Sequence, residues 1–511
     1  MQVDDGRARF LERAVVALAF LTIASFFPWF EPLHSPNELT RIYLASALVE
    51  DGTVCIDPQI QKNGGIFDIS VRDGKTYSDK APGVAFLSVP VIAAYEALTD
   101  HPTLSGKVRL VRLVVSTLPT LLLLFWMLRF LREHIPDRGL RLALVTAYAL
   151  GTVATAYSGL AFGHQLSAVV LFGLFLLIRK VPLERPPSIP RLMSIGVVTA
   201  FAVWVEYQNV LLLVPLAGFF VWRARRSFVR SFAFAAAGAA PLIAVLLLYH
   251  KAAYGSPFLT GYSFIASSFK EVHKQGLLGV ALPKATHAWL SFLSPAKGIF
   301  FFAPWLALVI PATIVAWRKA GSDGRVSVLI IVLYALFVSA LVYPDGGWTM
   351  SQRHLVPMIP FVVMPVGLLI QRVPALRIVF AGLALASIAA CTTGAVVWPH
   401  YQDHLQNPTF QLGFPMLRDG WVPTSIVNVL DLRSKTFLIA LMAIAALVVV
   451  AGTFDGLLQK ARRIPLLVVA TLAAFAIAFV YLSFASRPGA AQDVRGDRAW
   501  VETVYDRDWS S

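Results

Sequence analysis

The sequence predicts an all-α integral membrane protein with about thirteen transmembrane helices. Hydrophobic residues make up 57% of the 511 residues and charged residues only 14%, whereas soluble domains carry about a quarter charged residues. The mean hydropathy is +0.67. The apolar residues gather in runs of roughly 20, which is the length that crosses a hydrocarbon core about 30 Å thick. Such runs must be helical, because lipid offers backbone groups no hydrogen-bond partners.

These runs define one polytopic membrane domain over residues 1–485, followed by a short polar tail, 486–511, that we expect to be flexible. Each run is bounded by Arg, Pro or Gly. The predicted spans are 14–30, 108–128, 141–161, 165–178, 192–206, 208–222, 231–250, 298–317, 326–343, 354–370, 376–397, 435–453 and 464–485.

Basic residues predict the orientation of the spans. The net charge of +15 comes from Arg and Lys at the ends of apolar runs, which argues against nucleic acid as a partner. All seven basic connections fall on one side, and the positive-inside rule makes that side the cytoplasm. The N-terminus is then cytoplasmic and the C-terminal tail lies outside. The connections contain Arg7, Arg9 and Arg13; Arg129, Arg132, Arg138 and Arg141; Arg179, Lys180, Arg185 and Arg191; Arg223, Arg225, Arg226 and Arg230; Arg318, Lys319 and Arg325; Arg372 and Arg377; and Lys460, Arg462 and Arg463.

The segment 83–97 decides this topology. It is apolar, but it is shorter than a span and contains Pro90. Counting it as a span would invert every later loop, so we interpret it as a juxtamembrane helix at or dipping into the outer face. The outer side then receives the long loops 31–107, 251–297 and 398–434. Chemistry is expected there, because function usually lies on loops held by a rigid scaffold.

The first outer loop holds the densest group of ionisable residues. Glu38 and Arg41 lie one helical turn apart, so they either serve a catalytic site or pair along a helix face. Lys80 follows Asp79, and it is either a phosphate clamp or half of a solvated ion pair.

Five stretches together resemble the GT-C class of membrane glycosyltransferases, which includes the protein O-mannosyltransferases and the lipid A aminoarabinose transferase. Pro36-Asn37-Glu38-x-x-Arg41 looks like the Asp-Glu-x-x-Tyr/Arg motif of that class, and Tyr77 to Gly83 is similar to its Lys-Pro-Pro segment. Three later segments are similar to loops of bacterial members. They are Gly255 to Tyr262, Leu293 to Phe300 and Gly346 to Pro357.

The resemblance implies transfer of a sugar from a polyprenyl-phosphate carrier to a lipid, glycan or protein acceptor, with inversion, outside the bacterial cytoplasmic (inner) membrane. Glu38 matches the motif's Glu and is the expected base. Asn37 stands where the motif usually has Asp, which leaves Asp79 as the alternative base and puts a divalent metal (Mg or Mn) in doubt. Lys80 matches the phosphate-binding Lys.

Further residues are candidates for the same site. Arg353, Arg41 and Lys297 are expected to bind the donor phosphate alongside Lys80. For sugar or acceptor contacts we consider Asn37, His164, Glu206, Tyr77, Trp348 and His354. Each has a structural alternative: His164 could hydrogen-bond backbone at a helix end, Glu206 could pair with a buried cation, and Trp348 could anchor the chain at the interface.

Two other functions remain open. A transporter or lipid flippase would place its ionisable residues near the bilayer midplane and often shows two related halves, and neither is visible here. An inactive GT-C-like subunit of an envelope polysaccharide machine is compatible with Asn37 and His164 at positions where acids are usual. The sequence contains no Gly-x-x-x-x-Gly-Lys-Ser/Thr loop, so ATP or sugar-nucleotide chemistry lacks support.

Overall fold

The computed structural model describes residues 2–26, 30, 33, 35–266, 271, 275–276, 279–430, 432–458 and 464–505. It confirms the all-α membrane fold. Among the described residues, seven helical segments are long and apolar enough to cross a membrane, and α4, α9 and α10 are shorter apolar helices. The total of thirteen spans stays a prediction.

Every predicted span coincides with a helix or a run of helices. In the first half these are α1 Gln2–Ala24, α5 Leu104–Arg112 with α6 Leu118–His134, α7 Arg138–Leu150 with α8 Ala154–Ser158, α9 Gly163–Arg179, α10 Ile189–Val205, α11 Asn209–Ala224 and α12 Phe228–Tyr254. In the second half they are α15 Ile299–Phe302 with α16 Val309–Lys319, α17 Gly321–Ala340, α18 Ile359–Arg372, α19 Leu376–Val397, α21 Ser434–Thr453 and α23 Ile464–Ala485. Shorter helices are α14 Ala285–Phe292, α20 Phe414–Asp419 and α22 Asp455–Leu458.

Local sequence signals account for several of these boundaries. The Thr103 hydroxyl accepts a hydrogen bond from the Gly106 amide at the start of α5, and Asp137 caps α7 through the Leu140 amide. Both are N-caps that satisfy otherwise unpaired amides. The long helix α12 ends at Gly255, whose φ of 79° is left-handed, a conformation that glycine adopts at little cost.

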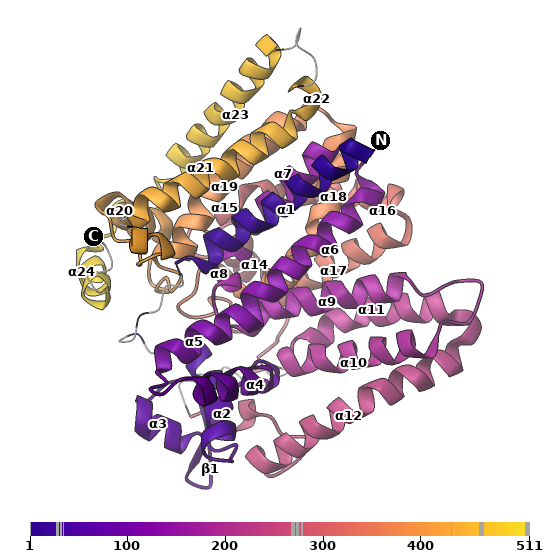
Figure 1. Ribbon diagram of the computed structural model, residues 1–511, viewed down its shortest axis with the longest axis vertical. Coiled ribbons are helices and arrows are strands. Elements are labelled where there is room, and N and C mark those ends of the chain that lie inside the picture. Colours follow the sequence, from indigo (N-terminus) through magenta and orange to yellow (C-terminus); the bar gives the residue numbers. More distant parts are fainter. Residues whose placement is uncertain are drawn as a thin grey trace.

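Short basic connections and long polar loops lie at opposite ends of the molecule. The N-terminus, α22 and the α11–α12 turn lie at one end, and the first outer loop, α20 and α24 lie at the other (Figure 1). Helix α7 is buried along almost its whole length, since every residue from Gly139 to Leu150 is buried. The basic segments at the N-terminus and between α11 and α12 therefore lie at the same end, and which end is cytoplasmic stays a prediction.

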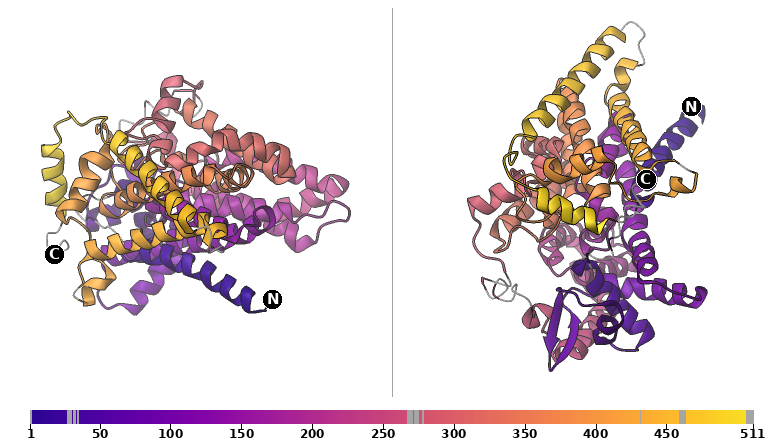
Figure 2. Two further views of the ribbon diagram at one scale, coloured as in Figure 1. Left: turned by 90° about the horizontal axis from the view of Figure 1, so that it is seen from above. Right: turned by 90° about the vertical axis from the view of Figure 1, so that its left-hand side faces the viewer.

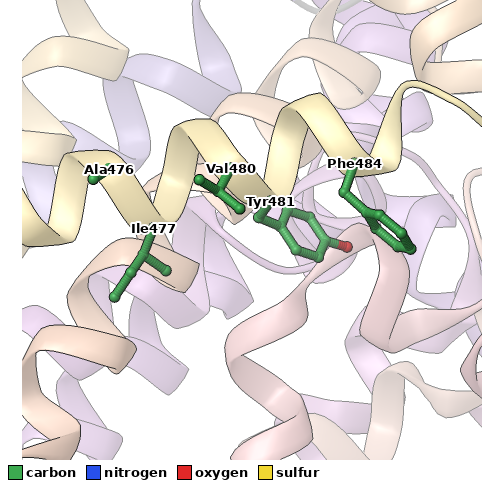
Figure 3. A pocket seen from close by; sticks show the side chains of 5 residues that line it. All are labelled: Ala476, Ile477, Val480, Tyr481 and Phe484. Atoms are coloured by element: carbon green, nitrogen blue, oxygen red, sulfur yellow. The ribbon is translucent and has the colours of Figure 1, made fainter.

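Helix α23 lies at the edge of the bundle (Figures 1 and 2). Along it runs an apolar cavity of about 430 Å³, lined by Ala476, Ile477, Val480, Tyr481 and Phe484 and shown from close by in Figure 3. The hydroxyl of Tyr481 donates to the carbonyl of Phe301 at 2.6 Å. No candidate site residue lines this cavity, and its apolar surface suits contact with lipid tails.

The first outer loop folds into α2 Pro36–Glu50, α3 Asp57–Asn63, a hairpin of β1 Ile69–Arg72 and β2 Lys75–Ser78, and α4 Gly83–Leu98. The antiparallel hairpin was not foreseen. It turns at Asp73 and Gly74, whose φ values are 51° and 74°, and Asp-Gly is the sequence signal for such a turn. Helix α4 packs beside α2, as expected for a juxtamembrane helix.

The described part of the C-terminal tail is ordered, contrary to our expectation. Helix α24, Arg495–Val504, is followed by Tyr505, whose hydroxyl donates to the carbonyl of Val397. The Tyr505 ring packs against Phe30 and Trp398, and these aromatic contacts dock the tail. Residues 506–511 lie outside the described residues, as does the basic connection Lys460, Arg462 and Arg463.

The orientation can be tested by cysteine labelling. We expect Ser188→Cys, between α9 and α10, to be protected from a membrane-impermeant maleimide, and Thr424→Cys, in the loop before α21, to be labelled in intact cells. Both positions are exposed. The experiment uses a Cys55→Ser background, because Cys391 is buried and Cys55 is not. Labelling of Ser188→Cys with protection of Thr424→Cys would contradict the orientation.

Candidate functional site

Charged residues from distant parts of the chain meet where the first outer loop covers the ends of the spans. Asp79 and Lys80 follow β2, Arg41 lies on α2, and Glu206 caps the end of α10. Figure 1 shows α2 and α4 beside the ends of α9 and α10. Asp68, just before β1, completes an ionic network that we call the Lys80 cluster: Asp68, Asp79 and Lys80.

Within this cluster, the Lys80 ammonium lies between two carboxylates. Its Nζ is 2.8 Å from Asp79 Oδ2 and 3.0 Å from Asp68 Oδ2. The backbone of Gly261 approaches so closely that a Cβ there would lie 2.7 Å from the Asp79 Cα. Only glycine permits this approach, which covers Asp79 and leaves its side chain buried.

The two partners of this ion pair respond differently to burial. Burial and the negative charge of Asp68 raise the pKa of Asp79, although Lys80 opposes them. Burial alone would lower the pKa of Lys80, but Asp68 and Asp79 outweigh it and raise that pKa. Lys80 therefore stays charged. Asp79 Oδ1 is buried without a hydrogen-bond partner among the described residues, so one of its oxygens is available to a ligand.

Arg41 is held by a second buried ion pair. Its Nη2 lies 2.5 Å from Glu206 Oε1, and its Nη1 donates to the carbonyl of Asn37 at 2.6 Å and to the Asn37 side chain. A Cβ at Gly163 would collide with the Glu206 carboxylate. The missing side chain lets this anion sit at the N-terminus of α9, where the helix dipole favours it.

Glu38 forms a third pair, with a residue that the sequence did not single out. Arg112 Nε and Nη2 bind Glu38 Oε1 and Oε2 at 2.8 and 2.6 Å, and the Ala161 amide donates to Oε1 at 2.7 Å. Both side chains are fully buried. The suggested Glu38–Arg41 pair is therefore wrong. Bidentate binding occupies both oxygens of Glu38, which argues for a structural role and favours Asp79 as the base.

Two histidines lie close to Glu206. His164 is 3% exposed, and neither ring nitrogen has a hydrogen-bond partner in the described part of the chain. Its Nδ1 lies 3.5 Å from Glu206 Oε1, and its ring centroid lies 5.2 Å from that of His354. His354 Nδ1 is 2.7 Å from Gln208 Oε1. Buried polar atoms without partners are rare in proteins and need an explanation such as a ligand or water.

Arg353 is a cation of this region that has no carboxylate partner among the described residues. Its guanidinium carbon lies 5.8 Å from the centroid of the Phe162 ring, and its Nε is buried without a hydrogen-bond partner within the described ranges. Among the residues described, no carboxylate lies within ion-pair distance of it. A half-buried guanidinium of this kind is a strong candidate for binding a phosphate, which it can contact through two parallel hydrogen bonds.

Three predicted site residues make other contacts. Lys297 donates to the carbonyls of Gly347 and Thr349 at 2.7 and 2.9 Å, and burial lowers its pKa to about 7. Trp348 is 43% exposed and meets Trp500 edge-on at 5.5 Å. Tyr77 is buried against Tyr254. These contacts give Tyr77 a packing role and leave Trp348 as a partly exposed aromatic surface.

The described residues contain no group of three or more His, Cys, Asp or Glu side chains that could hold a metal ion. Asp68 and Asp79 are two adjacent carboxylates, and divalent cations favour such oxygen ligands. The Lys80 ammonium, however, occupies the position between them. The Mg²⁺ or Mn²⁺ considered from the sequence therefore does not fit the residues present here.

Comparisons with known proteins extend this picture. No family model and no curated protein matches the sequence. Two solved structures of ArnT from Cupriavidus metallidurans do match the fold. The structure bound to undecaprenyl phosphate has a TM-score of 0.51 and 12% identity, and the match covers 96% of this chain and 79% of that one. The apo structure has a TM-score of 0.52 and 14% identity, covering 93% and 78%.

The chain has a GT-C-like fold. This confirms the architecture expected from the five sequence stretches, since the match extends over nearly the whole chain. At this level of identity the likeness establishes the fold alone, and the roles of individual residues are argued from the geometry of this chain.

The geometry around Glu38 predicts a stability defect. Glu38→Gln removes one partner of a fully buried ion pair and leaves Arg112 uncompensated, which costs about 3–5 kcal/mol. We expect a clearly lower unfolding temperature in detergent than for the wild type. Glu50→Gln, on the same helix in a partly exposed network, should cost less. A Glu38→Gln protein with wild-type stability but no activity would instead favour Glu38 as the base.

Proposed function

We propose that this protein is a glycosyltransferase that moves a sugar from a polyprenyl-phosphate carrier to an acceptor at the outer face of the bacterial inner membrane. The observation that carries the proposal is the Lys80 cluster, in which a buried aspartate adjoins a buried ammonium group and keeps one oxygen without a hydrogen-bond partner in the described part of the chain. It lies on a fold similar to that of ArnT, which was solved with undecaprenyl phosphate. Arg353 adds a second cation.

The proposed reaction is a single displacement. The acceptor hydroxyl attacks the anomeric carbon as the bond from that carbon to the phosphate oxygen breaks, and the carrier phosphate leaves with the bonding electrons. The hydroxyl proton passes to Asp79. Attack opposite the leaving group inverts the anomeric centre. Lys80 and Arg353 stabilise the charge that develops on the departing phosphate, the step at which preorganised cations accelerate a reaction most.

Donor binding also prepares the base. The incoming phosphate competes with Asp79 for the Lys80 ammonium, to which Asp79 is bound at 2.8 Å. As Lys80 turns toward the phosphate, Asp79 loses its nearest cation, and its pKa, already raised by burial, rises further. Asp79 then becomes a stronger base only when the donor is present, which limits reaction without a donor.

The remaining polar groups suit the sugar. Neither ring nitrogen of His164 has a hydrogen-bond partner among the described residues, and Nδ1 lies 3.5 Å from Glu206 Oε1. In this proposal both nitrogens hydrogen-bond sugar hydroxyls. Arg41 and Asn37 are tied to each other and hold Glu206 in place. In this proposal they shape the wall of the sugar site without taking part in bond making.

Asp79→Asn tests the assignment of the base. We expect turnover to fall about 100-fold or more, the usual contribution of a general base, while affinity for undecaprenyl phosphate is kept. Wild-type turnover should fall as the pH drops through the raised pKa of Asp79, because the base must be deprotonated. Release of polyprenyl phosphate is measured in nanodiscs for a panel of polyprenyl-phosphate sugars, with membranes supplying the acceptor.

The matched control is Asp73→Asn, an exposed aspartate in the hairpin turn, which should leave turnover unchanged. Wild-type turnover in Asp79→Asn would exclude this base. Binding of carrier without turnover for any sugar, even in the wild type, would favour an inactive subunit. Carrier-independent movement of a solute across vesicles would favour a transporter.

Metal removal provides a second test. The described residues contain no group of three or more metal-ligating side chains, and without donor Lys80 lies between Asp68 and Asp79. We therefore expect initial rates to be the same in excess EDTA and in added Mg²⁺ or Mn²⁺. The rates are compared in the same nanodisc preparation. A rate that EDTA abolishes and Mg²⁺ restores would contradict this account of the cluster.

A further inference from the structure

The loop that leads into Arg353 has an unusual backbone. Gly346 and Gly347 have φ values of 70° and 76°, and Ser351 has a φ of 58°. A left-handed conformation suits glycine, but at Ser351 it is unfavourable and must be stabilised by its surroundings. The loop 344–352 therefore depends on contacts from outside itself to keep this shape.

Lys297 supplies those contacts through its side-chain nitrogen and its main-chain carbonyl oxygen. Its Nζ donates to the carbonyls of Gly347 and Thr349 at 2.7 and 2.9 Å. Its main-chain oxygen accepts from Ser351 Oγ at 2.8 Å and from the Gln352 amide at 3.0 Å. The side chain is 1% exposed, so water does not compete. We call these four hydrogen bonds the Lys297 clasp.

The clasp leaves Lys297 little capacity for a ligand. An ammonium has three protons. Even in the charged form two of them are given to the carbonyls, and Thr349 Oγ1 lies 3.5 Å from the Nζ. A phosphate could bind Lys297 only by breaking the loop's hydrogen bonds. The phosphate-binding role suggested by the sequence therefore conflicts with the contacts that Lys297 makes.

The same clasp fixes the position of the Arg353 backbone. The Gln352 amide, bound to the Lys297 oxygen, immediately precedes Arg353, and the Gln352 side chain donates to the Pro344 carbonyl. Its Oε1 accepts from the His354 amide at 3.3 Å. The backbone on both sides of Arg353 is thus fixed, while its guanidinium has no carboxylate partner among the described residues.

We propose that Lys297 is a positioning residue. It stabilises the loop 344–352, in which Gly346, Gly347 and Ser351 have left-handed backbone conformations, and it thereby orients the Arg353 side chain toward the donor phosphate. This inference rests on the proposed function, in which Arg353 binds that phosphate. It assigns Lys297 an indirect effect on donor affinity that passes entirely through Arg353.

A double-mutant cycle tests this dependence. Affinity for undecaprenyl phosphate is measured in nanodiscs for Lys297→Met, Arg353→Gln and the double variant. We expect each single variant to weaken binding about tenfold or more, as expected for loss of a hydrogen bond to a charged group. The double variant should bind no more weakly than Arg353→Gln alone. Effects that multiply in the double variant, or an unchanged affinity in Lys297→Met, would overturn the proposal.

A milder variant tests the clasp in case Lys297→Met does not fold. Ser351→Ala removes only the hydrogen bond to the Lys297 oxygen, and it should weaken binding by a smaller factor that also vanishes in the Arg353→Gln background. Lys284→Met changes an exposed lysine of the same outer loop, and it should bind like the wild type. An effect of Ser351→Ala that persists without Arg353 would count against the clasp.

A readout independent of binding separates the clasp from the proposed function. Trypsin cleaves after arginine, and Arg353 is half-buried in a loop that the clasp holds. We expect faster cleavage after Arg353 in Lys297→Met than in Lys284→Met or the wild type. Equal cleavage rates would refute the clasp. If cleavage accelerates but Arg353→Gln binds carrier normally, the clasp stands and the proposed phosphate role of Arg353 fails.

Discussion

The structure depends on pairing every charge that the first outer loop buries against the bundle. Removing an ion from water costs several kcal/mol even after relaxation, and only close partners repay it. Glu38 therefore meets Arg112, Arg41 meets Glu206, and Lys80 meets Asp68 and Asp79. Each of the first two pairs joins α2 to a different membrane helix, so the pairs fix the loop over the ends of the spans. The glycines at 163 and 261 permit this close approach.

The charged groups differ in how many hydrogen-bond partners the protein gives them. We infer structural roles for the fully bound groups and substrate contacts for the others. Glu38 has both oxygens bound by Arg112 and one of them also by a backbone amide, so most of its hydrogen-bonding capacity is used within the protein. By contrast, one oxygen of Asp79 and both ring nitrogens of His164 have no hydrogen-bond partner in the part of the chain that the structure describes. Arg353 has no acid beside it in the described residues, and the Lys297 clasp holds the loop that carries it. Arg353 acts electrostatically on both His164 and Asp68 of the Lys80 cluster, so these groups share one region of the molecule.

The sequence predicted much of this fold, because run length and basic flanks follow directly from the physics of the bilayer. Helices lie at all the predicted spans, and the segment around Pro90 forms a short helix beside α2. The pairings could not be predicted. Glu38 and Arg112 are 74 residues apart, and Arg41 and Glu206 are 165 apart, so no local pattern links them. Asp68 belongs to no motif, so it was not predicted as a site residue. Lys297 was predicted to bind phosphate because a sequence does not show which backbone carbonyls its side chain contacts. The hairpin turn at Asp73-Gly74 was readable, and α24 docks through aromatic residues within a tail that is otherwise polar.

The central claim is that Lys80 exchanges Asp79 for a carrier phosphate. The most direct measurement is a density map of the protein in nanodiscs with undecaprenyl phosphate bound. We expect the phosphate within hydrogen-bond distance of Lys80 and Arg353, with the Lys80 ammonium moved away from Asp79 and the Asp79 carboxylate facing the phosphate. A phosphate bound elsewhere, with Lys80 still held between Asp68 and Asp79, would contradict it.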